Sequence, residues 1–236
     1  MQSFSLKEKT LLAGRYRIEK ALGSGWEGEV YLISELGTGI ERAVKLFYPN
    51  RNKKRAASRR YARMLHKLRG LPSLIQYHGH EELEIDGEQV VALISEYIEG
   101  EILSAFIQRQ PGKRMTELQA ALLLYELACG VEGIHLAGEY HGDLHPQNII
   151  VCRYGLGFDV KFVDFYNHGR VERARRDEDL FALIRIFYEA LGGQKRYHHF
   201  SNTAQYICAG LKSNHILRRF KTVTHLRSHL EHMVWE

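Results

Sequence analysis

The apolar pattern of this 236-residue chain changes its period near Gly100, and this change constrains the fold more than any other feature of the sequence. Before Gly100, short alternating runs predict three antiparallel strands within 16–47 and a hairpin within 83–98. Apolar residues at helical spacing predict one basic amphipathic helix over 52–69. The N-terminal part is therefore expected to be a five-stranded antiparallel sheet with one helix.

Beyond Gly100 the helical period dominates. We expect helices over 117–137, 179–191 and 222–234. Two short strands are expected between the first two helices, over 148–154 and 160–165. Strand-rich and helix-rich parts follow one another instead of alternating, which predicts an α+β fold of two packed lobes. We expect a single domain over 1–236, with an N-lobe at about 1–98 and a compact, mainly helical C-lobe at about 99–236.

The composition is that of an ordinary globular protein. The chain is 44% hydrophobic and 26% charged, and no apolar run reaches the roughly 18 residues that span a bilayer. The N-terminal segment carries charges where a signal peptide has an uninterrupted apolar stretch. The three cysteines form neither an even set nor a C-x-x-C pair, which argues against a disulfide framework. We therefore expect a cytoplasmic protein.

The excess of positive charge is concentrated in one segment: Arg51, Lys53, Lys54, Arg55, Arg59, Arg60 and Arg63. Such a patch is typical of a solvated helix face, and it also suits an acidic or anionic partner. Neither an aromatic platform nor a nucleic-acid motif accompanies it, so nucleic acid is a minor hypothesis.

Three segments carry the residues expected to do chemistry. They are Gly23-Ser24-Gly25-Trp26-Glu27-Gly28-Glu29-Val30, Ala43-Val44-Lys45, and His141-Gly142-Asp143-Leu144-His145-Pro146-Gln147-Asn148 with the following Val163-Asp164-Phe165. In the last of these, an Asp, an Asn five residues later and a second Asp delivered by a hairpin can gather a base and oxygen ligands around a metal-bound phosphate.

In this order the motifs resemble the protein-kinase-like superfamily over nearly the whole chain. The H-G-D-x-H-P-x-N form is especially similar to the small bacterial-type Ser/Thr kinases and to the aminoglycoside phosphotransferase-type branch. The resemblance implies a bilobal protein-kinase-like fold. It also implies ATP and Mg²⁺ as cofactors, with transfer of the γ-phosphoryl group to a hydroxyl acceptor.

The resemblance also implies how the nucleotide is held. The bare backbone of the glycine-rich loop would approach the triphosphate, and Lys45 would pair with the α- and β-phosphates. The Glu96 carbonyl and the Ile98 amide would bond the adenine edge, and Ser95 would be a small gatekeeper. The residues expected to bind the nucleotide are Gly23, Ser24, Gly25, Gly28, Val30, Ala43, Lys45, Ser95, Glu96 and Ile98.

The catalytic roles follow from the same resemblance. Asp143 would accept or orient the proton of the attacking hydroxyl, and Lys45 would offset the charge on the transferred group. Asn148 and Asp164 would hold Mg²⁺. His145 stands where many protein kinases have a lysine, and we expect it to substitute in part for that lysine.

Further residues are expected to support or extend this machinery. His141 would brace the catalytic loop, and Asp179 would support its backbone from the following helix. The segment from Tyr166 to Asp179 is short and lacks an A-P-E sequence, so a long activation loop is not expected. Its basic residues suit an acidic substrate and a solvated loop about equally: Arg170, Arg173, Arg175 and Arg176.

The sequence departs from the family pattern at two points. The expected helix over 52–69 contains no Asp or Glu, so the usual glutamate partner of Lys45 is absent. Either an acid from elsewhere, such as Glu27, orients Lys45, or the protein is slow or inactive. In addition, Tyr166 replaces the glycine of the D-F-G motif, which restricts the backbone there.

The favoured function is ATP-dependent transfer to a protein Ser or Thr. An antibiotic- or sugar-type small-molecule phosphotransferase is one alternative, and a nucleotide-binding pseudokinase that acts as a regulatory binding module is another. The histidines His225, His229 and His232 recur at helical spacing. We interpret them as the exposed flank of a C-terminal core helix in preference to a metal site.

Overall fold

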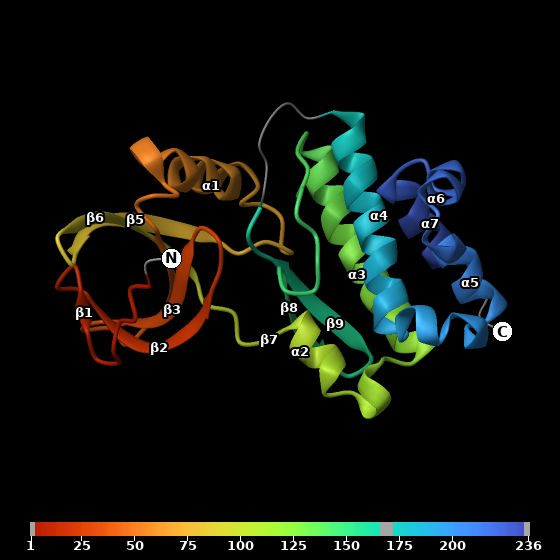
Figure 1. The fold of residues 1–236 in the computed structure, drawn as a ribbon, viewed down its shortest axis with the longest axis horizontal. Helices are drawn as coiled ribbons and strands as arrows, with labels where there is room; N and C mark the ends of the chain where they lie inside the picture. Colours follow the sequence, from red (N-terminus) through yellow and green to blue (C-terminus); the bar gives the residue numbers. More distant parts are fainter. Residues whose placement is uncertain (1–2, 166–171, 234–236) are drawn as a thin grey trace. The chain divides into compact units, whose positions relative to one another are not determined.

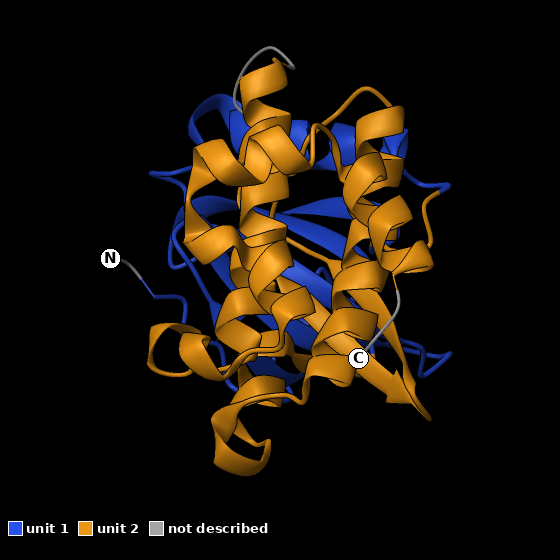
Figure 2. Cartoon of the chain, turned by 90° about the vertical axis from the view of Figure 1, so that its right-hand side faces the viewer, with its two compact units in different colours: residues 1–70, 75–98 blue, residues 71–74, 99–236 orange. Residues whose placement is uncertain are grey.

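The computed structural model describes residues 3–165 and 172–233, and these divide into two compact units (Figure 2). Unit 1 comprises residues 1–70 and 75–98, and unit 2 comprises residues 71–74 and 99–236. Tyr166 and Arg170, which the sequence analysis singled out, lie outside the described residues.

Unit 1 is built on one antiparallel sheet (Figure 1). Among the described residues it has six strands in the order β1-β2-β3-β4-β6-β5. Their bounds are Leu11–Leu12 for β1, Tyr16–Ser24 for β2, Gly28–Glu35 for β3, Glu41–Phe47 for β4, Tyr77–Ile85 for β5 and Glu88–Glu96 for β6. The prediction of five strands was wrong by one, because β1 has only two residues and is too short to show a strand period.

The alternation of side chains along these strands gives unit 1 its core. One face of the sheet buries Tyr31 and Ile33 of β3, Val44 and Leu46 of β4, and Ile94 of β6 in a single apolar cluster. Full burial of a large aliphatic or aromatic side chain stabilises a fold by about 1.5–3 kcal/mol. The register of the sheet is therefore fixed, since a slip by one residue would expose this whole set.

Helix α1, Ala56–Lys67, is the one α-helix of unit 1 within the described residues. It was predicted from residue 52, but a 3₁₀ turn over Lys53–Arg55 precedes it. Lys54 and Arg55 have φ angles of 52° and 59°, which lie in the left-handed region. A right-handed α-helix needs negative φ angles, so α1 cannot begin before Ala56. Tyr61 and Leu65 lie on the buried face of the helix, as the spacing predicted.

Unit 2 contains most of the helices and a small sheet. Its elements are β7 Glu101–Ile102, α2 Leu103–Gln108, α3 Glu117–Leu136, β8 Ile149–Tyr154, β9 Gly157–Phe162, α4 Arg173–Ala190, α5 Asn202–Cys208, α6 Ser213–Arg219 and α7 Val223–His232. The antiparallel sheet β7-β8-β9 adjoins the long helix α3, which packs along α4 in Figure 1. Thr116 and Gln119 form a reciprocal capping box that fixes where α3 begins.

The predicted boundaries of two elements in unit 2 were wrong. Helix α4 begins at Arg173 and not at residue 179, and Arg173 and Arg175 pair with Asp177 and Glu178 in its first turns. Strand β9 begins at Gly157 and ends at Phe162, earlier than the predicted 160–165. Among the described residues, no helix combines the length and the apolar composition needed to cross a membrane.

Candidate active site

One face of the unit 1 sheet brings together several of the residues predicted to bind a nucleotide. Val30 of β3 lies directly opposite Lys45 of β4, and Ala43 lies opposite Ser95 of β6. Opposite residues share a face of the sheet, and so do residues two apart in one strand. Val30, Ala43, Lys45 and Ser95 therefore share the face that points away from the apolar cluster described above.

The three glycines of the glycine-rich segment, which runs from the end of β2 to the start of β3, have different roles. A Cβ atom added at Gly23 or Gly25 would meet no other protein atom within 4 Å, so the bare backbone there leaves room for a ligand. A Cβ at Gly28 would lie 1.9 Å from the carbonyl oxygen of Leu46, which leaves no space for any side chain. Gly28 is thus needed for packing on β4, whereas the open backbone of Gly23 and Gly25 fits the predicted phosphate contact.

Lys45 lies in a largely desolvated position with a carboxylate beside it. Its side chain is 10% exposed, and its Nζ lies 3.2 Å from Oε2 of Glu27. The ring centroids of Phe47 and Tyr61 lie 5.2 Å and 5.0 Å from the same Nζ, within the range of cation–π attraction. Helix α1 therefore reaches Lys45 through an aromatic ring, and Glu27, one of the alternatives for its acidic partner, lies beside it.

The segment predicted to contact adenine ends strand β6. The Ser95 side chain is buried, and the backbone N–H of Glu96 donates to the Gln76 carbonyl at 2.9 Å. Ile98 follows the strand in irregular, half-buried backbone. These residues lie where the resemblance placed them in the chain, and their contact with adenine stays a prediction.

In unit 2, the loop from His141 to Asn148 is anchored to a buried carboxylate. Asp179 of α4 is 1% exposed and accepts hydrogen bonds from the backbone N–H groups of His141 (2.8 Å) and Gly142 (2.9 Å). Nε2 of His135, in the last turn of α3, lies 3.0 Å from the same carboxylate. A buried carboxylate with several donors holds its partners rigidly, because each donor left unpaired would cost free energy.

His141 itself is enclosed by aromatic rings. It is fully buried, stacks on Phe165 at a centroid distance of 4.4 Å and meets the edge of Phe162. Burial lowers the pKa of His141 to about 4, although the nearby carboxylates of Asp179, Asp143 and Asp164 act in the opposite direction. The ring is therefore neutral near pH 7, which agrees with the predicted bracing role.

We predict that acidification destabilises the fold through His141. Its pKa falls from 6.5 to about 4 on folding, so between these values the unfolded chain binds a proton that the folded chain excludes. The free energy of unfolding then decreases as the pH drops below 6.5, by about 1–2 kcal/mol at pH 5. Urea unfolding of wild type and His141→Gln at pH 7 and pH 5 measures this, since the contributions of other groups cancel between the two proteins. Equal losses in both would contradict the prediction.

Asp143 and Asn148 form a pair within the loop. Nδ2 of Asn148 donates to the Asp143 backbone carbonyl at 2.9 Å and to its Oδ2 at 3.0 Å. The Asp143 side chain is 49% exposed, and His145 Nε2 lies 3.5 Å from its Oδ2. The loop thus presents a carboxylate that is fixed by an amide on one side and open to solvent on the other.

Asn148 and Asp164 supply oxygen atoms of the kind that Mg²⁺ prefers. Both partners of Asn148 Nδ2 are acceptors, which fixes the amide orientation and leaves its oxygen as the remaining acceptor atom. The Val163 N–H donates to the Asn148 carbonyl at 3.0 Å and so joins this loop to the segment of Asp164. Asp164 has a φ angle of 55°, which Asp tolerates better than most residues. This donor set fits the predicted metal.

The comparison with protein families identifies the chain. The family model described as "Protein kinase domain" matches residues 16–208, which is well over half of the chain. The chain belongs to the protein kinase domain family.

Relatives of this kinase domain occur in bacteria and plants. It is 29% identical to the "Serine/threonine-protein kinase pkn2" of Myxococcus xanthus over 67% of this chain and 18% of that protein. It is 30% identical to the "Putative cyclin-dependent kinase F-2" of Oryza sativa over 77% of this chain and 56% of that protein. With the "Probable serine/threonine-protein kinase YbdM" of Bacillus subtilis it shares 29% identity over 81% of this chain and 76% of that protein. The kinase domain thus spans less than two thirds of the length of the first two relatives.

Two side chains of the kinase domain contact predicted site residues, and the sequence assigned a role to neither of them. His135 bonds Asp179, and the ring of Tyr61 lies beside Lys45. Both residues lie within helices, and the only sign of a role in the sequence is that each carries a polar group on its side chain. Such a signal is too weak to assign a partner that is distant in the sequence.

The histidines of α7 do not share one environment. His225 and His232 are exposed as expected, but His229 packs its ring near Tyr206 and Phe220, at centroid distances of 5.3 Å and 5.4 Å. Burial lowers the pKa of His229, and Arg219 adds to this. The prediction that all three lie on an exposed flank was therefore wrong for His229, which contributes to packing.

Proposed function

We propose that this kinase domain transfers the γ-phosphoryl group of ATP to a Ser or Thr hydroxyl of a protein. The observation that carries the proposal is the half-exposed Asp143 carboxylate, held by Asn148 in a loop that is anchored on the buried Asp179. A fixed carboxylate that is open to solvent suits the orientation of an incoming hydroxyl and the acceptance of its proton.

The residues of unit 2 would act on the acceptor and the metal. Asp143 orients the hydroxyl, and Asn148 and Asp164 hold Mg²⁺, which offsets the charge of the transferring phosphoryl group when it is bound. His145 lies beside the Asp143 carboxylate and adds a donor to the phosphate side of the loop. In this proposal unit 2 corresponds to the C-lobe at about 99–236.

The residues of unit 1 would hold the nucleotide. Gly23 and Gly25 offer open backbone for the phosphates, and Lys45 pairs with the α- and β-phosphates. Ser95, Glu96 and Ile98 line the adenine position by resemblance to the family. Unit 1 then corresponds to the N-lobe at about 1–98 of a single kinase domain.

Transfer of labelled γ-phosphate from Mg-ATP to general protein acceptors and to small hydroxylated compounds tests this proposal. We expect label on Ser and Thr of protein acceptors. Label on small molecules alone would favour the small-molecule phosphotransferase. Saturable ATP binding without any transfer would favour the pseudokinase, and absence of ATP binding would refute a nucleotide-dependent function.

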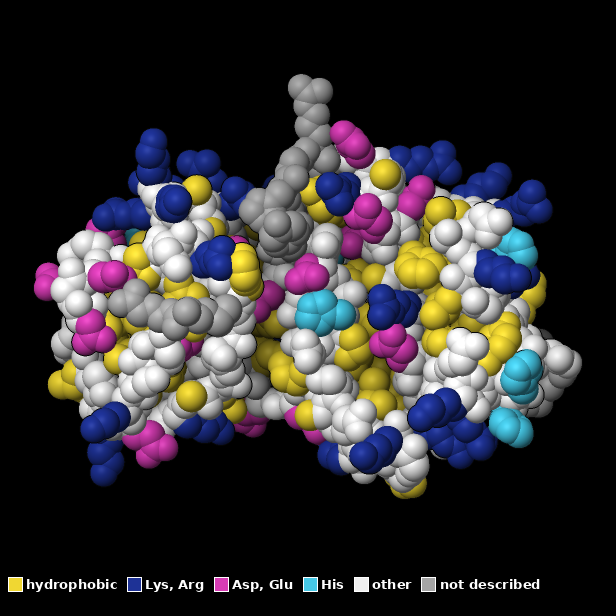
Figure 3. All heavy atoms as spheres, viewed as in Figure 1, with side chains coloured by type: hydrophobic (Ala, Val, Ile, Leu, Met, Phe, Trp, Pro, Cys, Tyr) yellow, Lys and Arg dark blue, Asp and Glu magenta, His cyan; other side chains and the backbone are white. Residues whose placement is uncertain are grey.

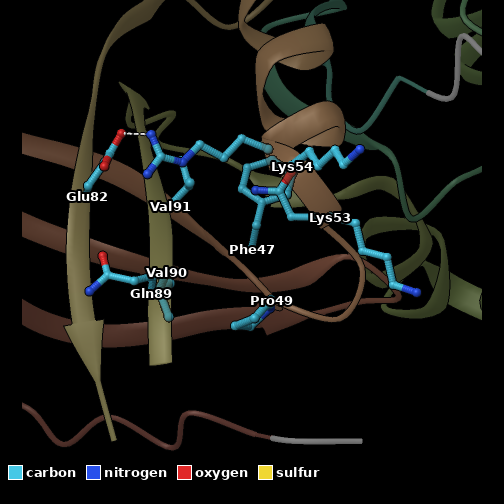
Figure 4. Close-up of a pocket in the computed structure, with 10 residues that line it drawn as sticks. Phe47, Pro49, Lys53, Lys54, Glu82, Gln89, Val90 and Val91 are labelled. Atoms are coloured by element: carbon cyan, nitrogen blue, oxygen red, sulfur yellow. Dashed lines mark hydrogen bonds and ion pairs between the residues drawn. The ribbon is translucent and has the colours of Figure 1, made fainter. Parts of the chain in front are cut away.

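We further propose that an acidic protein segment docks beside helix α1. A pocket in unit 1 has apolar side chains of β4 and β6 on one side and cationic side chains on the other (Figure 4). The lining residues are Phe47, Pro49, Asn52, Lys53, Lys54, Arg55, Glu82, Gln89, Val90 and Val91. The seven cations of 51–63 named above are all exposed, and Lys and Arg side chains gather over α1 in Figure 3. This combination suits a segment with negative charges around one apolar residue.

Reversal of charge at this pocket is expected to weaken such binding. The probe is a fluorescently labelled peptide in which glutamates surround one phenylalanine. Its binding to the protein is measured by fluorescence anisotropy. Lys53→Glu/Lys54→Glu should bind it about five- to tenfold more weakly at low salt, with a difference that shrinks as salt rises. Lys20→Glu, at an exposed position of β2, is the matched control. Equal binding by both variants, or tighter binding of a single-stranded oligonucleotide by wild type, would refute an acidic protein partner.

A further inference from the structure

We infer that Glu27 of the glycine-rich loop, and not a residue of helix α1, supplies the carboxylate that positions Lys45 for the nucleotide phosphates. This inference rests on the proposed nucleotide-binding function and concerns unit 1 alone. Protein kinases place the corresponding glutamate on the helix that follows the lysine strand. Here that helix and its flanks, residues 52–69, contain no acidic residue.

The direct contact is short and partly buried. Glu27 Oε2 lies 3.2 Å from Lys45 Nζ, and the two side chains are 26% and 10% exposed. An ammonium group with so little access to water is costly unless a negative charge and hydrogen bonds compensate it. Glu27 supplies a negative charge and a hydrogen-bond acceptor, and the rings of Phe47 and Tyr61 also lie beside Lys45.

The loop is fastened so that Glu27 stays near Lys45. The Glu27 carbonyl accepts a hydrogen bond from the Tyr48 N–H at 2.9 Å. One residue before Glu27, the Arg51 guanidinium lies over the ring of Trp26, with its Cζ atom 3.3 Å from the ring centroid. One residue after, Gly28 packs directly on the Leu46 carbonyl. Contacts on both sides of Glu27 thus tie the loop to the end of β4 and the turn that follows.

This arrangement places phosphate contact and orientation of the lysine on one loop, whereas the two functions lie on separate elements when the acid is on a helix. The loop whose open glycines would contact the phosphates also carries the group that orients the lysine for those phosphates. A displacement of the loop therefore changes both contacts together. Lys45 is oriented without an acid on α1, which contacts it through the ring of Tyr61.

Glu27→Gln tests the inference in the full chain. The amide keeps the shape of Glu27 but loses its charge, so we expect kcat/KM for Mg-ATP to fall about tenfold or more. The melting temperature should fall only modestly, because the new amide oxygen can still accept a hydrogen bond from Lys45 and the position is partly exposed. Glu27→Asp, which keeps a carboxylate, should retain more activity than Glu27→Gln. Glu35→Gln, which alters a partly buried carboxylate paired with Arg15 at the other end of β3, is the matched control and should leave kcat/KM unchanged.

A second-site variant adds a readout that a purely structural role would not move. Tyr61 faces Lys45 from α1, so Glu27→Gln/Tyr61→Glu returns a carboxylate to Lys45 from the helix. We expect it to recover part of the lost ATP affinity, measured by calorimetric titration on protein shown to be folded.

Several outcomes would overturn the inference. If Glu27→Gln binds ATP more tightly or transfers faster than wild type, Glu27 competes with the phosphates for Lys45. If the Glu27 variants match an active wild type, Glu27 has no positioning role while the proposed function stands. If wild type binds ATP without transfer, the same comparison is made on ATP affinity, and equal affinities refute the inference. A wild type that binds no ATP refutes both.

Discussion

Replacement of Asp143 by Asn is expected to reduce phosphoryl transfer by about 10²- to 10⁴-fold while ATP binding persists. The amide has the shape of the carboxylate but accepts no proton from an attacking hydroxyl. Asp143 lies in unit 2, and the residues proposed to hold the nucleotide lie in unit 1. The measurement is transfer of labelled γ-phosphate, together with calorimetric titration of Mg-ATP into each protein.

The local structure makes Asp143→Asn a clean test. The side chain is 49% exposed, and Asn148 also bonds the backbone carbonyl of residue 143, so the loop keeps an anchor in the variant. Asp159→Asn changes an exposed carboxylate of β9 in the same unit and should leave transfer unchanged. Full activity of Asp143→Asn would show that another group handles the proton.

The sheet of unit 1 was predictable because its signals are local. Short apolar and alternating runs within 16–47 and 83–98 indicate the strands, whereas the common face of Val30, Lys45 and Ser95 follows from the register of the folded sheet. Strand β1 and the short helices of unit 2 were missed because they have only two to seven residues. A segment of that length contains at most two helical turns or one strand repeat, which is too little to show a period.

Contacts between distant residues were not predictable in the same way. Glu29 was read only as part of the glycine-rich motif, yet its side chain is buried and accepts hydrogen bonds from the Phe4 N–H (2.9 Å), the Tyr48 hydroxyl (3.0 Å) and the Tyr31 hydroxyl. Burial acts to raise its pKa, but these hydrogen bonds together lower it. These hydrogen bonds thereby attach the N-terminal segment to the start of strand β3. No periodicity in the sequence marks a partner 25 residues away.

The candidate site lies between these two cases. The order of the motifs singled out residues of the catalytic loop and the glycine-rich loop, and their roles stay predictions. Glu27 was one of the alternatives for the partner of Lys45. Its selection depends on the backbone bond from Tyr48 and on the contact of Trp26 with Arg51, which only the folded structure shows. Asp179 was expected to support the loop, but its additional contact with His135 was not.

Removal of the Asp179 carboxylate is expected to give the largest loss of stability. Asp179→Ala leaves the N–H groups of His141 and Gly142 and the ring of His135 without their acceptor at a position that is itself buried. We expect the free energy of unfolding to fall by about 3–5 kcal/mol, in the range found when a buried polar network loses its central charge. Urea unfolding followed by circular dichroism at pH 7 measures this loss.

Two comparison variants separate this network from the helix that carries it. Asp179→Asn retains one acceptor oxygen but turns an NH₂ group toward N–H donors, so its loss should be smaller than that of Asp179→Ala but still clear. Asp177→Ala removes a carboxylate two residues earlier in α4, whose ion pair with Arg173 has a separation of 3.8 Å. Exposed pairs of this kind contribute about 0–1 kcal/mol, so this variant should stay near wild type. If Asp179→Ala costs no more than Asp177→Ala, the buried carboxylate does not hold the catalytic loop, and the rigidity of Asp143 must come from its other contacts, such as those with Asn148 and His141.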